Sequence, residues 1–299
     1  MNKIGNIGIF TSGGDSPGMN AAIRAVVKAA KINGIKTTGI IKGYEGIIDG
    51  KFVNIDEQAV NNIAHCGGTI LRTARSSRFL TVEGRQQALG NIQNEGIDAL
   101  IAIGGDGTFK GLLAFSEISN LPVIGIPGTI DNDLTGTDFT LGFDTAVNTA
   151  LESIDKIRDT ADAHERIFIV EVMGRDAGYI AINSGIASGA EGVLIPESTA
   201  DIDRLINMVK RGWKKEHSSL IIIVSEGDET GAAEVAHQLK HIDETFDIRI
   251  TILGHVQRGG NPSYADRLLG TKMGVIAVKA LLNNETNKIH TTFKCDAIC

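Results

Sequence analysis

The chain has 299 residues, which is long enough for two domains at about 150 residues per domain. Its 29 lysines and arginines against 36 aspartates and glutamates give a formal net charge of −7, which excludes a protein that holds nucleic acid by a broad basic surface. Hydrophobic residues at 42% and charged residues at 22% are typical of a globular protein and exclude a disordered or collagen-like chain.

Short apolar runs alternate with helical patterns along the chain, which is typical of βαβ units and a parallel sheet. The predicted strands cover residues 7–10, 37–41, 99–103, 123–126, 167–172, 193–195, 220–224 and 248–253. Open α/β sheets bind ligands at the carboxyl ends of their strands, so the turns that follow these strands are the candidate functional sites. A helical pattern over 145–160 follows a glycine-dense loop and predicts a domain boundary near residue 140.

The first predicted strand runs into Gly13–Gly14, after which a helix is expected. Ser16 is the predicted N-cap and Pro17 the first helical residue, and an apolar face extends to Ala30. Gly104–Gly105 follows a later strand in the same way. Glycine lets the backbone approach a phosphate and a helix N-terminus offers unpaired N–H groups, so the two turns together indicate one bound polyphosphate. Each turn by itself is also consistent with a simple tight turn.

An aspartate follows each glycine pair. A carboxylate beside bound phosphate is unfavourable unless a cation lies between them, so Asp106 is a candidate Mg²⁺ ligand. Asp15 is better interpreted as a turn or first-turn helical residue. The sequence contains neither the Walker pattern nor GxGxxG after the first strand, which excludes the usual signatures of P-loop NTPases and dinucleotide-binding proteins.

Residues 127–133 hold a second candidate group, because Asp131, Asn132 and Asp133 come directly after a predicted strand. Two carboxylates at this spacing suit a general base and a partner for a cation's water shell, and an Asx-rich turn is the alternative. Arginines also recur in turns, which indicates an anionic substrate because a guanidinium group binds phosphate oxygens bidentately. These arginines are Arg72, Arg75, Arg166, Arg175, Arg258 and Arg267.

The cysteines and histidines give no comparable indication of a functional site. The three cysteines, Cys66, Cys295 and Cys299, lack metal-ligand spacing, and the seven histidines are interpreted as ordinary residues. The N-terminus lacks the apolar stretch of a signal peptide, and no apolar run reaches the ~18 residues needed to span a bilayer. We therefore expect a cytoplasmic protein with reduced thiols that binds neither nucleic acid nor a membrane.

A resemblance to a known family is based on seven motifs. They are TSGGDSPGMNAAIRAVV, GGTILRTAR, IAIGGDGTFKG, IPGTIDNDLTGTDFTLGFDTA, HERIFIVEVMGRDAG, VSEG and LGHVQRGGNPSYADR. With these motifs in this order, the chain resembles bacterial ATP-dependent 6-phosphofructokinases from its start to about residue 280. The resemblance implies an α/β fold of two doubly wound three-layer αβα domains with an active-site cleft between them. It implies an ATP-binding domain of residues 1–140 plus about 265–299, a fructose 6-phosphate-binding domain of residues 141–264, and a homotetramer.

The implied reaction transfers the γ-phosphoryl group of ATP, with Mg²⁺, to the C1 hydroxyl of fructose 6-phosphate in glycolysis. The resemblance makes Asp131 the base that activates this hydroxyl, with Thr129 and Arg175 as further catalytic residues. The matching ATP site consists of Gly14, Arg75, Ser76, Gly105, Asp106, Gly107 and Thr108, with Mg²⁺ at Asp106. The matching fructose 6-phosphate contacts are Thr129, Ile130, Asp131, Met173, Gly174, Arg175, Glu226 and Arg267, joined by Arg166 and Arg258 from a neighbouring subunit.

Two positions favour ATP over pyrophosphate as the donor. Pyrophosphate-dependent relatives carry an aspartate after GGD and a lysine before TIDND, where this chain has Gly107 and Gly128. Glycine leaves room for the rest of a nucleotide, whereas a carboxylate would repel its α-phosphate. A pyrophosphate-dependent phosphofructokinase and a nucleotide sensor without catalysis stay open as alternatives, and the retained TIDND segment argues against the sensor.

The family also has an effector site between subunits, which binds ADP as activator and phosphoenolpyruvate as inhibitor. The residues that match this site are Arg24, Lys28, Arg158, Glu191 and Lys215. Glu57 stands where relatives have an arginine, and Ser219 replaces a histidine. Exchange of arginine for glutamate changes the local charge by about two units, so we expect weak effector control. The chain also ends roughly 20 residues before its relatives, from which we expect weaker stability or assembly without loss of a catalytic position.

Overall fold

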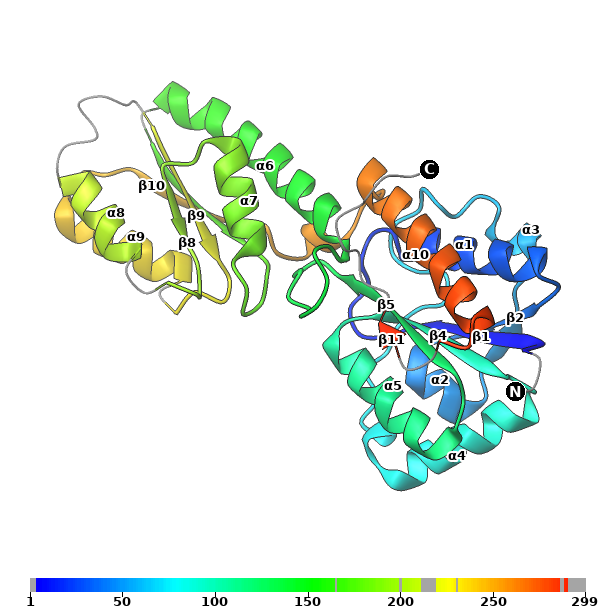
Figure 1. The fold of residues 1–299 in the computed structure, drawn as a ribbon. Helices are drawn as coiled ribbons and strands as arrows, with labels where there is room; N and C mark the ends of the chain where they lie inside the picture. The colour runs from blue at the N-terminus through cyan, green and yellow to red at the C-terminus, as the bar shows by residue number, and fades with distance from the viewer. Residues whose placement is uncertain are drawn as a thin grey trace. The chain divides into compact units, whose positions relative to one another are not determined.

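The chain folds into two compact units, each built on its own sheet (Figure 1). The computed structural model describes residues 4–164, 166–198, 201–210, 219–229, 231–285 and 288–289. Unit 1 comprises Met1–Ile130, Leu134–Asp144 and Arg258–Cys299, and unit 2 comprises Asp131–Asp133 and Thr145–Gln257. The chain passes from unit 1 to unit 2 after Asp144 and returns to unit 1 at Arg258, a few residues from the boundaries expected near 140 and 265. The short segment Asp131–Asp133 also belongs to unit 2.

Unit 1 holds a sheet in which β1 lies between β4 and β2. The strand order is β11 (Lys288–Ile289), β5 (Val123–Thr129), β4 (Ala99–Gly104), β1 (Asn6–Thr11), β2 (Lys36–Ile40) and β3 (Phe52–Asn54), and β6 (Leu141–Gly142) pairs with β5. These pairs are parallel except for β2 with β3. After β1 the chain adds strands on one side and then on the other, so the carboxyl ends of β1 and β4 form the topological switch point at which such sheets bind ligands.

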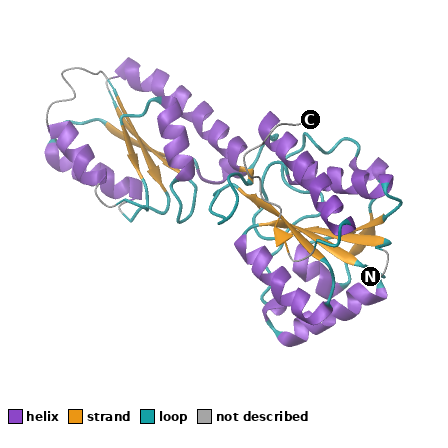
Figure 2. Ribbon diagram, viewed as in Figure 1, coloured by secondary structure: helices purple, strands orange, loops and turns teal. Residues whose placement is uncertain are grey.

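Helices cover both faces of this sheet, as Figure 2 shows. One face carries α1 (Met19–Ile32), α3 (Glu57–Val60) and α10 (Tyr264–Leu282). The other carries α2 (Gly43–Asp49), the short helix η1 (Arg78–Leu80), α4 (Val82–Asn94) and α5 (Asp106–Ser119). Successive residues of β4 serve opposite faces: Ile101 packs in the core under α1 and α10, and Leu100 in the core under α2, α4 and α5. Unit 1 is therefore a three-layer αβα arrangement.

The start of α1 differs from the prediction. The helix begins at Met19, and its N-cap is Gly18, whose φ of 98° lies in the left-handed region. The Ser16 hydroxyl is buried without a hydrogen-bond partner in the described part of the chain, while the Ser16 carbonyl oxygen accepts the Met19 N–H at 3.3 Å. Packing against α10 accounts for the shift, because a Cβ at position 18 would lie 3.2 Å from the carbonyl oxygen of Asp266. The prediction of Ser16 as the N-cap, with Pro17 as the first helical residue, is wrong.

Unit 2 has a parallel sheet in the order β10 (Ile248–Ile252), β7 (Ile167–Val172), β9 (Leu220–Ser225) and β8 (Gly192–Leu194). Figure 2 shows α6 (Phe143–His164) and α7 (Tyr179–Ser188) on one face, with α8 (Asp201–Lys210) and α9 (Gly231–Ile242) on the other. Leu205, Val209, Val235 and Leu239 belong to the core beneath α8 and α9. The short helix η3 (Gly254–Arg258) follows β10. Unit 2 is a second three-layer arrangement.

The predicted α/β class with two three-layer αβα domains is confirmed. Every predicted strand is present, and the helical pattern over 145–160 lies inside α6. β3, β6 and β11, which have two or three residues each, were not predicted. β8 is as short as β3, but its apolar run continues to Ile195 and was recognised. In the described ranges, no helix has both the length and the apolar character needed to cross a bilayer.

Candidate functional site

The two glycine turns lie side by side in unit 1. β1 and β4 are neighbouring parallel strands, and the Ser12 N–H donates to the carbonyl oxygen of Ile103 at 3.0 Å. The Thr108 hydroxyl donates to the carbonyl oxygen of Ser12 at 3.1 Å, so the turn after β1 is tied to the first turn of α5. The turns that the sequence singled out therefore meet at the switch point of the sheet.

Two glycines at the second turn, Gly104 and Gly107, have different surroundings. A Cβ on Gly104 would lie 2.4 Å from Thr108 Oγ1 and 2.5 Å from the Ser12 carbonyl oxygen, so the close approach of the turns requires its absence. Gly107 is exposed, and a Cβ there would meet nothing within 4 Å. α5 starts at Asp106 with Gly105 as its N-cap. The unpaired N–H groups and the positive dipole end of such a helix start are suited to bind phosphate.

Tyr44 on α2 holds the start of α5 from the inside of the unit. Its buried hydroxyl donates to the carbonyl oxygen of Thr108, and burial raises the pKa of Tyr44 above its ordinary value. The Tyr44 ring stacks on Phe79 with centroids 4.0 Å apart and meets Phe10 edge-on at 5.0 Å. An aromatic cluster thus fixes the backbone of the second glycine turn against α2.

Asp106 is the candidate cation ligand at this helix start. Its carboxylate is exposed, and Oδ2 pairs with Lys110 Nζ one turn further on at 2.6 Å. Mg²⁺ in enzymes is commonly bound by one or two carboxylates together with substrate phosphates, so an exposed carboxylate beside a phosphate-binding turn fits this ion. Within the described ranges, no group of three or more His, Cys, Asp or Glu side chains is arranged around a metal position.

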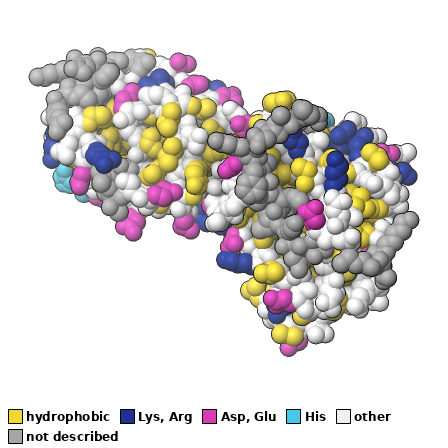
Figure 3. Space-filling view, in the orientation of Figure 1, with side chains coloured by type: hydrophobic (Ala, Val, Ile, Leu, Met, Phe, Trp, Pro, Cys, Tyr) yellow, Lys and Arg dark blue, Asp and Glu magenta, His cyan; other side chains and the backbone are white. Residues whose placement is uncertain are grey.

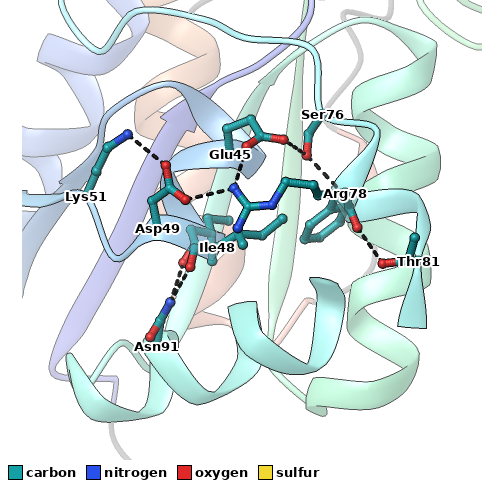
Figure 4. Close-up of polar contacts among 10 residues, drawn as sticks. Glu45, Ile48, Asp49, Lys51, Ser76, Arg78, Thr81 and Asn91 are labelled. Carbon is teal, nitrogen blue, oxygen red and sulfur yellow. Dashed lines mark hydrogen bonds and ion pairs between the residues drawn. The ribbon is translucent and has the colours of Figure 1, made fainter. Parts of the chain in front are cut away.

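The loop before η1 carries Arg75 and Ser76, both assigned to ATP by the resemblance. The Ser76 hydroxyl donates to Glu45 Oε1 at 2.5 Å and accepts the Phe79 N–H at 3.1 Å (Figure 4). Ser76 thus anchors the loop to α2. The side chain of Arg75 is exposed to solvent at the same loop.

Arg78 extends this anchor, as Figure 4 shows. Its Nη1 donates to Glu45 Oε2 at 2.9 Å and to Asp49 Oδ1 at 2.8 Å. The Lys51 ammonium pairs with the other oxygen of Asp49 at 2.7 Å. Hydrogen bonds from Lys51 and Arg78 lower the pKa of Asp49 from 3.8 to about 2. These residues hold the loop in place against α2.

Arg258 lies beside the first glycine turn of its own unit. Its Nη2 donates to Asp15 Oδ1 at 2.6 Å, and a Cβ on Gly14 would lie 2.8 Å from the same nitrogen. Asp15 is therefore an ion-pair partner in addition to a turn residue. Arg267, which the resemblance assigns to the sugar phosphate, lies on α10 and donates from Nε to the carbonyl oxygen of Pro262 at 2.7 Å. Both arginines belong to unit 1.

Thr129 and Ile130 are the last residues of unit 1 before the segment Asp131–Asp133. Thr129 is the last residue of β5, and its carbonyl oxygen accepts the Thr140 hydroxyl at 2.7 Å. Ile130 is buried. The chain enters unit 2 at the next residue, Asp131.

Unit 2 brings three predicted residues together at the carboxyl ends of β7 and β9. Arg175 follows β7, and its backbone N–H donates to Glu226 Oε1 at 2.9 Å. Arg175 Nε lies 3.9 Å from Asp131 Oδ2. The Asp131 carboxylate is 10% exposed, whereas the Arg175 side chain is 65% exposed. A nearly buried carboxylate that faces a guanidinium group suits a general base near an anionic substrate.

The turn between β7 and Arg175 needs glycine. Met173 is half-buried, and Gly174 has a φ of 144°, so a Cβ there would lie 2.4 Å from the carbonyl oxygen of Ala177. Arg175 itself has a φ of 53° in the left-handed region. Backbone strain of this kind is concentrated at functional sites, which supports the assignment of these three residues to a binding turn.

Arg166 lies at the other end of β7. Its Nε donates to Asp247 Oδ2 at 2.7 Å, and Arg249 Nη2 lies 3.0 Å from Oδ1 of the same carboxylate. The hydrogen bond from Arg166 lowers the pKa of Asp247. β7 has six residues, which is roughly 20 Å of extended chain at about 3.3 Å per residue, so Arg166 and Arg175 of one chain cannot meet. Arg249 was not predicted as a site residue, although an arginine inside a mainly apolar predicted strand was a signal for it.

The residues matched to the effector site lie in both units. Arg24 and Lys28 are one turn apart on α1 of unit 1. In unit 2, Arg158 donates to Glu191 Oε1 at 3.3 Å and to the carbonyl oxygen of Ser188 at 3.1 Å. Glu57 is exposed in the first turn of α3. Lys215 lies outside the described residues.

The phosphofructokinase family model matches residues 6–281. The chain belongs to the phosphofructokinase family. This confirms the resemblance inferred from the motifs. A relative from Bacteroides thetaiotaomicron, named ATP-dependent 6-phosphofructokinase 2, is 51% identical over 288 residues, which are 96% of this chain and 88% of the relative. The ATP-dependent 6-phosphofructokinase of Bacillus subtilis is 49% identical over 279 residues, which are 93% of this chain and 86% of the relative.

Solved structures of phosphofructokinases share the fold. A chain of the phosphofructokinase from Saccharomyces cerevisiae superposes with a TM-score of 0.89 at 39% identity; the match covers 93% of this chain and 42% of the yeast chain. The present chain therefore spans less than half of that yeast chain. A pyrophosphate-dependent phosphofructokinase from Marinobacter aquaeolei gives a TM-score of 0.82 at 22% identity, with 95% of this chain and 77% of that chain covered. At this identity the second likeness shows a common fold alone.

Proposed function

We propose that this phosphofructokinase transfers the γ-phosphoryl group of ATP to the C1 hydroxyl of fructose 6-phosphate, giving fructose 1,6-bisphosphate. The observation that carries the proposal is the meeting of the two glycine turns at the switch point of unit 1, with Asp106 at the start of α5. The names of relatives that are about half identical over nearly the whole chain support the same reaction.

ATP is bound by unit 1 in this proposal. The first-turn N–H groups of α5, together with Gly14, Gly105 and Thr108, hold its phosphates, and Arg75 supplies a positive charge from the neighbouring loop. Asp106 is the residue that would hold Mg²⁺, which when bound neutralises phosphate charge. Gly107 leaves open space beside the phosphates, as a nucleotide requires.

Asp131 acts as the general base. Its nearly buried Oδ2 faces the Arg175 guanidinium group at 3.9 Å, which favours the ionised carboxylate that must accept the proton of the C1 hydroxyl. Arg175 also offers a positive charge to the transferred phosphoryl group, and Thr129 stands two residues before the base. Phosphoryl transfer depends mainly on such positioning and charge neutralisation.

Fructose 6-phosphate is bound by Met173, Gly174, Arg175 and Glu226 at the carboxyl ends of β7 and β9. Its phosphate requires further positive charge, and Arg166 with Arg249 forms an arginine pair at Asp247. This pair is a whole strand away from Arg175, which supports a site completed by the arginines of a neighbouring chain. A homo-oligomer, a homotetramer by family resemblance, is therefore part of the proposal, with Arg258 as a further candidate from the neighbouring chain and Arg267 as one from the same chain.

ATP is favoured over pyrophosphate by the surroundings of two glycines. A side chain at position 107 would project into open space that the nucleotide needs. A Cβ on Gly128 would lie 3.1 Å from Ile103 Cγ2 and 3.2 Å from Met19 Cε, so the lysine of pyrophosphate-dependent relatives has no room without displacement of the core.

The test is a coupled assay for fructose 1,6-bisphosphate with fructose 6-phosphate and Mg²⁺, run in parallel with ATP and with pyrophosphate. Activity with ATP alone supports the whole assignment. Activity with pyrophosphate alone overturns the donor and keeps the acceptor. A protein that binds ATP and forms no product with either donor is a nucleotide sensor, which overturns the proposed function.

A further inference from the structure

We propose that His237 and His241 on α9 form a surface site for a divalent transition-metal ion that imidazole ligands prefer, such as Zn²⁺ or Ni²⁺. The two histidines are four residues apart on one helix, and their Nε2 atoms lie 3.2 Å apart. The site is on unit 2, and the reaction proposed above does not use it. Figure 3 shows histidine atoms at the surface over the end of unit 2 that carries α8 and α9.

The distance between the two nitrogens fits a chelated ion. Zn²⁺–imidazole bonds are 2.0–2.1 Å long, so two nitrogens 3.2 Å apart subtend roughly 100° at a shared ion. This angle lies between the right angle of square-planar or octahedral coordination and the larger angle of a tetrahedron. The rings, whose centroids are 4.4 Å apart, can therefore ligate one ion without a change of the backbone.

When no ion is bound, the same contact is an N–H···N hydrogen bond. Replacement of this bond by a metal ion conserves the protons on the two rings. In that bond one ring donates its Nε2 proton and the other accepts it. To ligate, both rings must be neutral with the proton on Nδ1, so each Nε2 offers a lone pair. One ring changes its tautomer, and no net proton is released if both rings start neutral.

Glu234 is placed to favour this tautomer at His237. Its Oε2 lies 3.8 Å from His237 Nδ1, one turn earlier on the same face of α9. Gln238 Nε2 donates to the other oxygen of Glu234 at 3.0 Å and so orients the carboxylate. A carboxylate that accepts a hydrogen bond from the second ring nitrogen raises the basicity of a metal-bound histidine, so a side-chain movement of Glu234 from 3.8 Å to hydrogen-bond distance would strengthen the site.

Helix α9, which was not predicted from the sequence, brings the two histidines together. Ala232, Val235 and Leu239 are buried against the sheet, which turns His237 and His241 to the solvent side. A spacing of four residues places two side chains on one helical face, whereas in a strand it would place them too far apart to chelate. The histidines were interpreted as ordinary residues because no metal-ligand spacing was recognised among them, although His237 and His241 stand at a spacing that chelates on a helix.

Two protein ligands leave the other coordination positions to water or to a ligand from another molecule. Each histidine then carries half of the protein's contribution, so loss of either ring should lower the affinity by at least about tenfold. His65, exposed in the loop after α3, has no such partner histidine in the described part of the chain and offers a matched control.

The test is titration of the full-length protein with NiCl₂ and with ZnCl₂ by calorimetry, in excess MgCl₂, for wild type, His237→Gln, His241→Gln and His65→Gln. We expect one tight equivalent in wild type and in His65→Gln, and at least about a tenfold loss in each of the other two variants. The thermal midpoint of unfolding should rise with Ni²⁺ in the same two proteins only.

Three outcomes would overturn the site: no binding to wild type, equal binding by all four proteins, or loss of binding in His65→Gln as well. Circular dichroism of each variant without metal establishes that the fold is retained. ATP-dependent activity of His237→Gln and His241→Gln should equal that of wild type. Failure of the proposed reaction would leave these metal titrations unchanged, so the two proposals are tested independently.

Discussion

Thr108 donates its hydroxyl to the carbonyl oxygen of Ser12, 96 positions earlier in the chain, and both residues are buried. The bond joins the two turns that we assign to the phosphates of ATP. The bond also leaves no room for a Cβ at position 104, which would lie 2.4 Å from Thr108 Oγ1 and 2.5 Å from the Ser12 carbonyl oxygen. The geometry of the nucleotide site is therefore fixed by contacts between distant parts of the sequence.

Thr108→Val should weaken ATP binding more than fructose 6-phosphate binding. The substitution keeps the volume but leaves the buried Ser12 carbonyl oxygen without this donor, at a cost of about 1–3 kcal/mol. We expect a higher KM for ATP and a lower free energy of unfolding, measured by steady-state kinetics and urea denaturation. Thr271→Val is the control, because Thr271 also donates to a carbonyl oxygen but does so on the exposed side of α10. Equal effects of Thr108→Val and Thr271→Val on the KM for ATP would show that Thr108 is not part of the ATP site.

Asp131→Asn should abolish most of the activity and spare ATP binding. The amide keeps the shape of the carboxylate but cannot accept the hydroxyl proton, and general-base catalysis contributes roughly 10²–10⁴-fold to a rate. We expect kcat to fall by that factor, with the ATP dissociation constant changed by less than about threefold. Asp155→Asn, an exposed aspartate on α6 that is assigned to no site, is the control. A fully active Asp131→Asn enzyme would contradict the assignment of the base.

Gly107→Asp should raise the KM for ATP without damage to the fold. The new side chain enters open space, so the thermal midpoint should stay close to that of wild type. Its negative charge lies beside the nucleotide phosphates and should raise the KM by at least about tenfold. Gly107→Asn has almost the same size without the charge. A similar KM in both variants would mean that volume, and not charge, selects the donor at this position.

Asp49→Asn should flatten the acid dependence of stability. Lys51 and Arg78 lower the pKa of Asp49 from 3.8 to about 2, so its ion pairs stabilise the folded state above the higher value and are lost as the pH falls through the lower one. Between about pH 4 and pH 2 the variant should therefore lose less free energy of unfolding than wild type does. Urea denaturation at several pH values measures this, with Asp155→Asn on the surface of α6 as control.

Micromolar ADP or phosphoenolpyruvate should leave the fructose 6-phosphate saturation curve nearly unchanged. By the family resemblance, Glu57 puts a negative charge at a position where an arginine is expected to bind a polyanionic effector. Glu57→Arg changes the local charge by about two units and should strengthen the response to either effector. Glu83→Arg is matched, since Glu83 is also an exposed residue in the first turn of a capped helix. A severalfold shift of the wild-type curve would show that Glu57 does not prevent effector binding.

The parts of the fold that sequence predicted best are those that repeat a pattern. β1 and β4 are buried apolar runs that end in glycine turns, and their parallel pairing places their carboxyl ends together without further information. The neighbourhood of Gly14 and Thr108 follows from that rule. The link between Arg175 and Glu226 also follows, because these residues come after neighbouring parallel strands. The approach of Asp131 to Arg175 does not follow from strand pairing, because Asp131 comes after β5 of the other sheet.

Contacts that depend on side-chain direction were not predictable in this way. Asp247 pairs with Arg166 and Arg249 because β10 and β7 align Arg249 with Phe168, a register that no periodicity reveals. The pair of Arg258 with Asp15 joins residues 243 positions apart. Ser16 had a sequence typical of an N-cap, but the packing of Gly18 against α10 moved the helix start. Tertiary contacts decided each of these cases.

β7 is hydrogen-bonded on both sides, to β10 and to β9, so its two ends are held at a fixed separation. If the proposed homo-oligomer dissociates, each chain keeps the cluster of Asp131, Arg175 and Glu226 but loses the arginines that we propose a neighbouring chain supplies to the sugar phosphate. Specific activity should consequently depend on protein concentration. On dilution, the turnover per chain should fall and the KM for fructose 6-phosphate should rise, while the affinity for ATP stays constant.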